Sequence, residues 1–210
     1  MTRRTSGRRS SEPRLAKGRG RVQKAGVRWV LSILFLFLAV ATAAWIFREW
    51  RHSKEHRFDP LIREVARQHG LPPSLVKAVI WRESGFNATA LGGVGELGLM
   101  QVTEGAAQEW ADARRDRQFQ AVHLTHPGTN LHAGCHYLAK VTRRYLRTDR
   151  PYAYALADYN AGRGNVLRWM HHGGETNAAL FLQGMTFPGT RDYVQSILQR
   201  SQLYERDFRP

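Results

Sequence analysis

The chain has 210 residues, enough for one ordinary domain and an appendage. Its formal net charge is +15, of which +9 falls in residues 1–47. Because most of the basic excess lies in this short tail and no base-reading motif follows it, we do not expect nucleic acid to be a partner. The single cysteine, Cys135, cannot form an intramolecular disulfide, so the fold must rest on its core. We expect Cys135 to be a small buried residue rather than a nucleophile.

The N-terminal part of the chain divides into three predicted segments. Residues 1–28 are rich in Arg, Ser and Gly, which is typical of a disordered basic tail. Residues 29–47 are apolar or small and uncharged, so they are long enough to cross a bilayer as one helix. Trp29 and Trp45 lie near the ends of this segment, where aromatic side chains favour the membrane interfaces. Residues 48–57 are charged and aromatic and are predicted to be a linker.

The distribution of charge predicts how this segment is oriented. The basic flank precedes the apolar segment, which favours a cytoplasmic tail and a domain on the periplasmic or extracytoplasmic side of the cytoplasmic membrane. Two small-x-small sites, Ala39-Val-Ala41 and Ala41-Thr-Ala43, are ones that a signal peptidase could accept. Because the apolar stretch continues past both sites, we favour an uncleaved, single-pass signal anchor.

Residues 58–210 are predicted to form one mainly helical domain. Asp59 before Pro60 is a good N-cap pair for a first helix, and Gly70 ends that helix. Prolines 72 and 73 start a second helix, which Gly85 breaks. Later helices are predicted after a Thr103 cap, around Asn130, from Pro151 to Gly162, at 164–172 and from Asp192, with an irregular stretch at 114–128. The one candidate for extended structure is a short turn and ribbon around residues 90–97.

A carboxylate occupies an unexpected position on the second of these helices. Val76, Val79 and Ile80 form an apolar stripe at helical spacing, and Glu83 is the next position on it. A glutamate in an apolar pocket tends to raise its pKa and hold a proton, which is what a general acid needs near neutral pH. Periodicity alone leaves open a second interpretation, in which Glu83 faces solvent or pairs with a neighbouring basic side chain.

The residues that follow favour the first interpretation. Gly85 breaks the helix two positions after Glu83, and a glycine-rich loop runs through residues 92–95. The chain resumes at Gly98-Leu-Met-Gln101. A carboxylate near a helix end that faces such a loop is placed like a residue of a cleft rather than of a core.

Four motifs follow one another along the domain. They are Glu83-Ser84-x-Phe86-Asn87 with Ala90 and Gly95-x-x-Gly98-Leu99-Met100-Gln101, then Asn130-Leu-x-x-Gly134-x-x-Tyr137-Leu138, then Ala157-Asp-Tyr159-Asn160-Ala161-Gly162, and finally Arg191-Asp-Tyr193-Val194. In this order they resemble the catalytic domain of lytic transglycosylases of the soluble lytic murein transglycosylase type, and the resemblance covers about residues 58 to 200. Two positions depart from the family pattern: Glu104 stands where a proline is common, and Glu96 where an alanine is usual.

The resemblance implies a lysozyme-like fold, in which helices enclose a long groove that binds sugars. It also implies cleavage of peptidoglycan glycan strands between N-acetylmuramic acid and N-acetylglucosamine, with 1,6-anhydromuramic acid as the product. Glu83 would act first as general acid and then as general base. The substrate would supply its own nucleophile, so the family needs no second carboxylate.

The resemblance also implies roles for six other residues. Ser84 and Tyr159 are expected to hold Glu83 by hydrogen bonds, with Tyr159 as the preferred partner. Gln101 and Asn160 are expected to bind the N-acetyl groups and the sugar ring. Met100 is expected to form an apolar wall of the groove, and Tyr193 to line the site. We expect Tyr137 to belong to the core.

No cofactor and no metal are expected. His171 and His172, with His132 or His136, lack Cys or acidic partners at ligand spacing and are predicted to be solvated.

Two other functions stay open at this point. Glu96 could serve as a second carboxylate in a muramidase of the same fold, where water attacks, or it could be a loop residue that binds substrate or forms a salt bridge. The domain could also be a wall-binding module without activity. Analysis of the products separates the first two possibilities, and replacement of Glu83 separates both from the third.

Overall fold

The structure is a computed structural model that describes residues 19–171 and 173–209, with side chains from residue 29 onward. The predicted disordered tail therefore lies outside the described residues as far as residue 18. The chain divides into two units, Met1–Arg51 and His52–Pro210.

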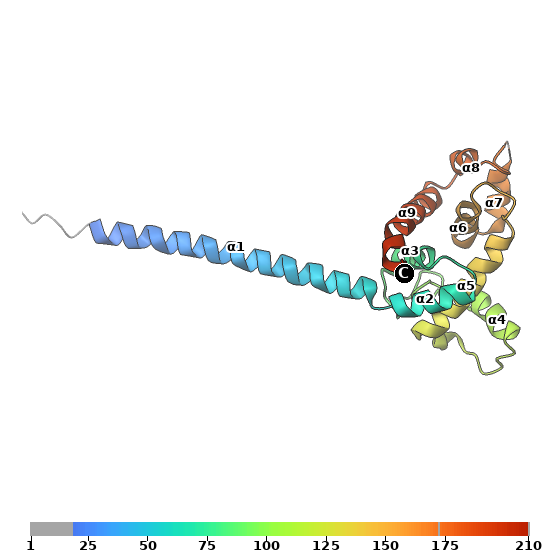
Figure 1. Ribbon diagram of the computed structural model, residues 1–210, viewed down its shortest axis with the longest axis horizontal. Coiled ribbons are helices and arrows are strands. Elements are labelled where there is room, and N and C mark those ends of the chain that lie inside the picture. Colours follow the sequence, from blue (N-terminus) through green and yellow to red (C-terminus); the bar gives the residue numbers. More distant parts are fainter. Residues whose placement is uncertain (1–18, 172, 210) are drawn as a thin grey trace, which may run out of the picture. The chain divides into compact units, whose positions relative to one another are not determined.

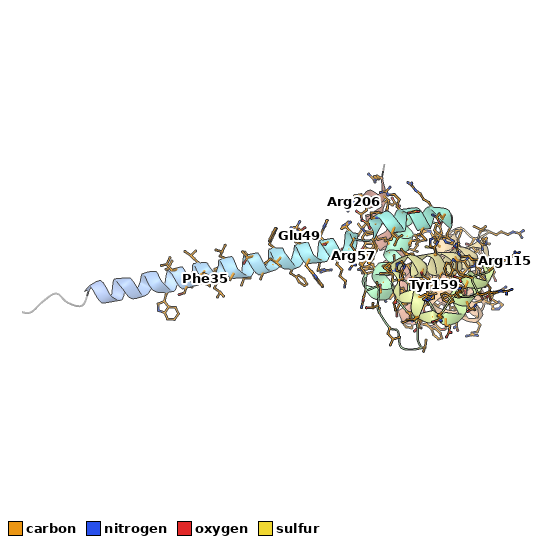
Figure 2. The ribbon with its side chains drawn as sticks, turned by 90° about the horizontal axis from the view of Figure 1, so that it is seen from below. Phe35, Glu49, Arg57, Arg115, Tyr159 and Arg206 are labelled. Carbon is orange, nitrogen blue, oxygen red and sulfur yellow. The ribbon has the colours of Figure 1, made fainter. Side chains whose placement is uncertain are left out.

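The first unit holds most of one long helix, α1 (Arg19–His56), which begins ten residues before the apolar segment. Its apolar side chains are exposed, and Phe35, at 74% exposure, projects from the helix in Figure 2. By length and composition this helix could cross a membrane, although a signal sequence near an N-terminus passes the same test. The residues predicted to form a linker, 48–57, are helical as far as His56.

The second unit is built from short helices, as the sequence predicts. They are α2 (Asp59–Gln68), α3 (Pro73–Ser84), α4 (Glu104–Ala113), η1 (Ala121–Thr125), α5 (Pro127–Arg143), α6 (Pro151–Ala161), α7 (Arg163–Met170), α8 (Ala178–Gly184), α9 (Pro188–Tyr204) and η2 (Glu205–Phe208). Extended structure in the described part of the chain consists of two isolated antiparallel bridges, Leu91–Leu97 and Leu97–Val102. The predicted turn and ribbon is therefore present, and the domain is mainly α-helical.

Helix α5 lies at the centre of the domain's packing. It contacts α2, α4, η1 and α6, while α3 lies along α9 and α6 also packs on α9 (Figure 1). The shared core is made of fully buried aliphatic side chains, among them Val76, Ile80, Leu138, Leu156 and Ile197. Cys135 is buried in the same core, as predicted.

Most predicted helix limits are correct. Gly85 caps α3 in the left-handed conformation with φ 54°, Thr103 Oγ1 accepts a hydrogen bond from Ala106 N, and α6 runs from Pro151 to a C-cap at Gly162. The prediction that Asp59 is the N-cap of the first helix of the domain is wrong. Phe58 is the N-cap of α2, because the Asp59 carboxylate is held instead by Lys77 Nζ at 2.8 Å.

Three helical segments differ from the prediction, one by an earlier start and two because they were not expected. Helix α9 begins at Pro188, four residues before the predicted start, since a proline suits the first turn of a helix. Helix α8 was not predicted, although its N-cap Asn177 accepts hydrogen bonds from Ala179 N and Leu180 N. The stretch 114–128, predicted to be irregular, contains the 3-10 helix η1.

Candidate active site

Glu83 lies in the last turn of α3, where the apolar face of the helix meets the glycine loop. Val76, Val79 and Ile80 are fully buried on that face, and Glu83 is half-buried. Gly85 then takes a positive φ that a side chain would strain, so the helix ends at Ser84 and the chain turns away. The stripe seen in the sequence therefore places the carboxyl group at the edge of the core.

Burial is the main influence on the protonation of Glu83. It raises the pKa of the carboxyl group because the charged form loses solvation, and the nearby Glu96 carboxylate adds to the increase. A hydrogen bond from Tyr193 and the charge of Arg82 oppose this shift, and the resulting pKa is about 7. Tyr193 donates that bond to Glu83 Oε1 at 2.5 Å. Glu83 can therefore hold or release a proton near neutral pH.

The partner of Glu83 differs from the one expected. Tyr193, on α9, is 4% exposed and makes the direct hydrogen bond, whereas the Tyr159 hydroxyl donates to the Met100 carbonyl at 2.8 Å. Tyr159 is nevertheless near Glu83. The pKa of the Tyr159 phenol is raised well above its ordinary value, mainly by burial and secondly by the charge of the Glu83 carboxylate. The fold decides between the two tyrosines, because α9 lies along α3 while α6 approaches the loop that follows it.

Ser84 and Met100 have structural contacts in place of the expected ones. Ser84 Oγ donates to the carbonyl groups of Ile80, at 3.2 Å, and of Leu99, at 2.8 Å, so it ties the end of α3 to the loop. The expectation that the Met100 side chain forms a groove wall is wrong. That side chain is fully buried, because it packs against Gly134 of α5 where no Cβ intervenes. Met100 meets Tyr159 through its backbone carbonyl.

Asn130 of α5 holds the loop in its shape. Its Oδ1 accepts from Met100 N at 2.8 Å, and its Nδ2 donates to the carbonyls of Leu97, at 2.7 Å, and Leu124, at 2.9 Å. Gly98 has φ +75°, and a Cβ there would clash with Asn130 Nδ2 and with the Leu124 carbonyl oxygen. The glycine and the buried asparagine of two separate motifs thus form one structural unit.

Gln101 and Asn160 lie at the ends of their motifs. Gln101 has a left-handed backbone with φ 47°, and its Nε2 donates to the carbonyls of Ala90, at 3.1 Å, and Gly98, at 3.0 Å. Its Oε1 atom keeps acceptor capacity. Asn160 is exposed, and its Oδ1 accepts a 2.9 Å hydrogen bond from Thr190 Oγ1 on α9. Its side-chain orientation is therefore fixed by the neighbouring helix.

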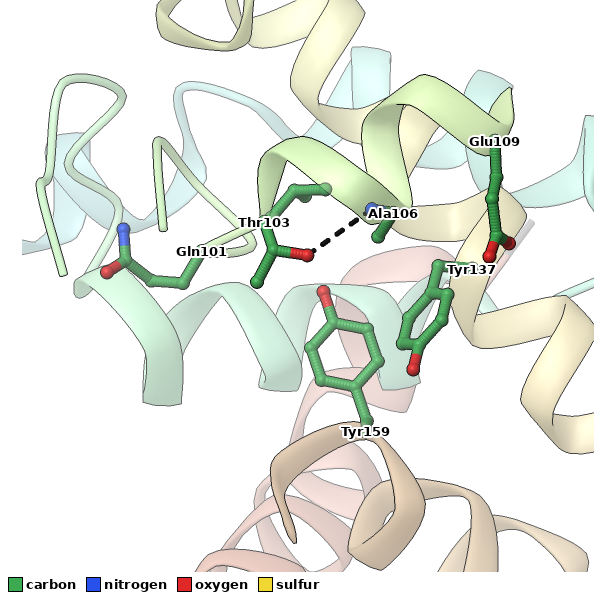
Figure 3. A pocket seen from close by; sticks show the side chains of 7 residues that line it. Gln101, Thr103, Ala106, Glu109, Tyr137 and Tyr159 are labelled. Atoms are coloured by element: carbon green, nitrogen blue, oxygen red, sulfur yellow. Dashed lines mark hydrogen bonds between the residues drawn. The ribbon is translucent and has the colours of Figure 1, made fainter. Parts of the chain in front are cut away.

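A pocket of about 220 Å³ opens beside these residues. Figure 3 shows Tyr159 and Tyr137 on one side of it and Gln101, Thr103 and Ala106 on another. The complete lining is Gln101, Val102, Thr103, Ala106, Glu109, Tyr137 and Tyr159. Glu83 does not itself line this pocket. Tyr159 is the residue that connects the two, because it lines the pocket and its phenol lies near the Glu83 carboxyl group.

Several lining residues were not predicted. Tyr137 packs against the core, as expected, but it is only half-buried and also lines the pocket, with its ring 5.5 Å from that of Tyr159. Thr103, the N-cap of α4, and Ala106 and Glu109 within the helix follow at i, i+3 and i+6, and they could have been found from that spacing. Glu109 forms an ion pair with Lys140 at this wall.

Glu96 is engaged within its own loop. Its Oε2 accepts a hydrogen bond of 3.1 Å from Val94 N. It is close enough to Glu83 to raise the pKa of that group, as described above.

One group of ligand-type side chains in the described residues, His56, Asp59 and Asp207, is compact enough for a metal ion. The ammonium group of fully buried Lys77 already occupies this group: Nζ lies 2.8 Å from Asp59 Oδ2, 2.7 Å from Asp207 Oδ2 and 3.1 Å from His56 Nδ1. A cation position is therefore filled by the protein itself. Of the other histidines considered, His171 is exposed and His172 lies outside the described residues.

The helical domain, with a half-buried glutamate at the end of one helix, defines a lysozyme-like domain. Three solved structures share this fold. A lytic transglycosylase Slt from Pseudomonas aeruginosa, in an inactive mutant form, has a TM-score of 0.64 and 28% identity over 70% of this chain and 24% of its own. The 70 kDa soluble lytic transglycosylase Slt70 from Escherichia coli has a TM-score of 0.64 and 27% identity over 71% of this chain and 24% of its own. A complex of the 70 kDa soluble lytic transglycosylase with bulgecin A has a TM-score of 0.66 and 26% identity over 74% of this chain and 25% of its own.

The chain belongs to the Transglycosylase SLT domain family, whose model matches residues 60–182. A membrane-bound lytic murein transglycosylase C from Yersinia enterocolitica is 35% identical over 123 residues, which cover 55% of this chain and 34% of the relative. Its counterpart from Yersinia pestis is 33% identical over 144 residues, 65% of this chain and 39% of the relative. The chain thus spans little more than a third of the length of these curated relatives. The resemblance found in the sequence motifs and the predicted lysozyme-like fold are both confirmed.

Proposed function

We propose that the chain is a lytic transglycosylase of peptidoglycan, which cleaves the β-1,4 bond between N-acetylmuramic acid and N-acetylglucosamine. The observation that carries this proposal is the state of Glu83: it is half-buried, its pKa is about 7, and its neighbour Tyr159 lines a pocket. An ordinary glutamate, with a pKa near ~4.3, would be almost fully ionised at neutral pH and would be a poor proton donor. Membership in the Transglycosylase SLT domain family supports the same reaction.

The reaction proceeds in two proton transfers on one carboxyl group. Protonated Glu83 donates its proton to the glycosidic oxygen, and the bond between that oxygen and C1 of muramic acid breaks. The Glu83 carboxylate then takes the proton from the C6 hydroxyl of the same sugar while O6 bonds to C1. No water is consumed, Glu83 is protonated again, and the product ends in 1,6-anhydromuramic acid. The attack is intramolecular, which gives it the rate advantage of a unimolecular step.

The surrounding residues fit supporting roles in this reaction. Tyr193 holds Oε1, so the exchangeable proton is carried by the other oxygen, Oε2, and Tyr193 acts as a positioning residue. Gln101 Oε1 can accept a hydrogen bond from an N-acetyl group of the substrate. The Asn160 side-chain NH₂ can donate one. Tyr159 lines the pocket near Glu83, and its hydroxyl donates to the Met100 carbonyl. Ser84 fixes the end of the helix that carries Glu83.

Hydrolysis by a water molecule is the competing reaction. It would call for Glu96 as a second carboxylate to activate or balance the attack. The hydrogen bond from Val94 N to Glu96 Oε2 favours a role for Glu96 in shaping the loop. A purely wall-binding domain would have no use for a carboxyl group whose pKa is set near neutrality.

We further propose that α1 anchors the catalytic domain to the cytoplasmic membrane and that this domain lies on the extracytoplasmic side, where peptidoglycan is found. The exposed apolar side chains of residues 29–47 suit a lipid environment, and the basic flank before them favours a cytoplasmic N-terminus. Relatives named membrane-bound lytic murein transglycosylases support the anchoring.

Digestion of purified sacculi with the detergent-solubilised full chain tests the reaction. Mass spectrometry should find anhydromuramic ends, whereas reducing ends would support hydrolysis. Glu83→Gln should abolish product release while far-UV circular dichroism stays unchanged. Glu96→Gln is the matched control and should keep most of the activity. Release of either product at an undiminished rate by Glu83→Gln would refute the assignment of Glu83.

A further inference from the structure

Arg144, the C-cap residue of α5, carries a guanidinium group that a buried carboxylate holds from one side. Its Nη1 donates to Asp158 Oδ2 at 2.8 Å. Asp158 lies on α6 and is 1% exposed, so the carboxylate that holds Arg144 belongs to the core. The ion pair therefore fixes the guanidinium group where the end of α5 meets α6.

Asp158 is itself held in place by a second donor. The Tyr145 hydroxyl donates to the same Oδ2 atom at 2.7 Å, and Tyr145 is also buried. A buried carboxylate needs such partners, because an unpaired charge in the core is costly. With a hydrogen bond from a phenol and an ion pair with a guanidinium group, Asp158 has little freedom to move. We therefore expect Arg144 to be better ordered than an arginine without a buried partner.

The other edge of this guanidinium group is free to bind a ligand. Nη1 is the one nitrogen of Arg144 that makes a hydrogen bond within the described residues, so Nε and Nη2 keep their N–H groups unpaired. These two nitrogens form the planar fork with which arginine binds both oxygens of a carboxylate. The side chain is 28% exposed, so an incoming group can reach the fork.

Arg144 lies near the pocket described above. Tyr137, which lines that pocket, is seven positions before Arg144 and projects to the same side of α5. The pKa of the Tyr137 phenol is raised first by burial and then by the Asp158 carboxylate, whereas Arg144 lowers it, so the charged groups are close to the phenol. Figure 3 shows Tyr137 between Tyr159 and Glu109. Arg144 is therefore at the Tyr137 end of the pocket.

The other charged groups at this end leave Arg144 as the donor available to a ligand. Lys140 Nζ lies 5.9 Å from the centre of the Tyr137 ring and forms an ion pair with Glu109. Arg163, at the start of α7, lies near Tyr145 and forms no ion pair with a carboxylate of the described residues. Its positive charge adds to the attraction that a negatively charged group would meet there.

We propose that Arg144 binds a carboxylate carried on the lactyl arm of muramic acid and so helps the domain to select its glycan strand. The inference rests on the proposed function for the nature of the strand. The lactyl group ends in a free carboxylate where the strand bears no peptide, and in an amide to a stem peptide, with carboxylates of its own, in intact peptidoglycan. The fork of Arg144 fits a carboxylate from either source. Because the contact is remote from Glu83, it should act on strand binding rather than on the chemical step.

The test compares untreated sacculi with sacculi whose carboxylates have been converted to neutral amides, using the full chain in detergent at about 0.15 M salt. Neutralisation should raise the apparent KM for muropeptide release at least about tenfold, because a charged hydrogen bond is lost, and it should leave kcat nearly unchanged. This first measurement uses the unmodified chain, so it does not depend on the folding of any variant.

Two variants of Arg144 then locate the contact. Arg144→Gln should have a high apparent KM for both kinds of sacculi, so that the difference between them disappears. Arg144→Lys keeps a cation for buried Asp158 but lacks the fork, so it should stay folded and lose most of the difference. Arg143→Gln is the matched control. Arg143 is exposed and lies near His136, on another side of α5, and its replacement should leave the difference in place.

Strands stripped of their peptides by an amidase identify the source of the carboxylate. A difference between untreated and neutralised material that persists in stripped strands assigns the lactyl carboxylate. A difference found in intact sacculi alone assigns the stem peptide. Either result supports the proposal.

Co-sedimentation of the Glu83→Gln chain with sacculi separates this inference from the proposed function. If no substrate yields muropeptides, the proposed function fails, but neutralisation should still weaken co-sedimentation at least about tenfold. The inference is overturned if neutralisation changes neither the apparent KM of the unmodified chain nor its co-sedimentation. It is also overturned if both Arg144 variants keep the full difference, or if Arg143→Gln removes it.

Discussion

The phenol of Tyr193 donates a 2.5 Å hydrogen bond to Glu83 Oε1, across 110 positions of the sequence. The bond joins α9 to the last turn of α3, so the C-terminal helix completes the environment of the carboxyl group. Burial raises the pKa of Glu83 and this hydrogen bond lowers it, which leaves the value at about 7. Removing the phenol should therefore change both the position and the proton affinity of the proposed general acid.

Tyr193→Phe should lower the turnover of sacculi roughly tenfold, because a hydrogen bond to a carboxylate contributes about 1.5 kcal/mol or more to positioning it. The pKa of Glu83 should rise, since an interaction that lowers it has been removed. The alkaline limb of the rate profile should then move to higher pH. The measurement is the release of muropeptides between about pH 5 and 9.

Tyr159→Phe is the control for this effect. It removes the hydrogen bond to the Met100 carbonyl and should reduce the stability of the loop, but it should leave the alkaline limb in place. If both variants move the limb equally, or neither does, the specific role of Tyr193 is wrong.

Glu83 should also make the stability of the domain depend on pH. Its pKa is raised from 4.5 in the unfolded chain to about 7 in the fold, so between these values the folded state binds more protons than the unfolded state. The free energy of unfolding should therefore fall as pH rises from about 4.5 to about 7, and the loss is complete above that range. It amounts to at most about 3 kcal/mol.

Urea denaturation of the full chain at several pH values, compared with Glu83→Gln, measures this effect. The variant lacks the ionisation and should gain in relative stability as pH rises through that window. A difference between the two proteins that is independent of pH would contradict the raised pKa.

Lys77 should be important for stability because it is fully buried between Asp59 and Asp207. Lys77→Met leaves two largely buried carboxylates without their cation, and we expect a loss of about 3 kcal/mol in the free energy of unfolding. Asp192→Asn is the control. It breaks the exposed ion pair between Arg82 and Asp192, which should cost less than about 1 kcal/mol. Equal losses in the two variants would show that burial does not govern the contribution of these ion pairs.

Alanine substitutions at Gly98 and Gly95 distinguish the cost of backbone strain from the cost of a steric clash. Both have positive φ, +75° and +96°, so alanine at either position should cost about 1–3 kcal/mol of strain. A Cβ at Gly98 also meets Asn130 and the Leu124 carbonyl, whereas nothing lies within 4 Å of a Cβ at Gly95. Gly98→Ala should therefore lose about 1–3 kcal/mol more than Gly95→Ala in thermal or urea denaturation. If the two losses are the same, the close approach to Asn130 has no energetic consequence.

The residues close in sequence to Glu83 were predictable because local rules govern them. An apolar stripe at helical spacing placed the carboxyl group on the inner face of α3, and Gly85 marked the end of that helix. Thr103 as a cap and Pro151 and Gly162 as the limits of α6 follow from the same short-range chemistry. Asp59 was misassigned because a buried lysine 18 positions away takes its carboxylate from the helix terminus.

Spacing and composition along the chain were thus enough to predict the helical domain, the apolar segment before it, and the carboxyl group at the end of α3. The packing of distant helices was needed to show that Tyr193 rather than Tyr159 holds Glu83, that the Met100 side chain belongs to the core, and that Tyr137 faces a pocket. It also brought His69 next to His132. Spacing along a helix fixes which face a side chain is on, whereas the packing of helices distant in sequence fixes what that face contacts.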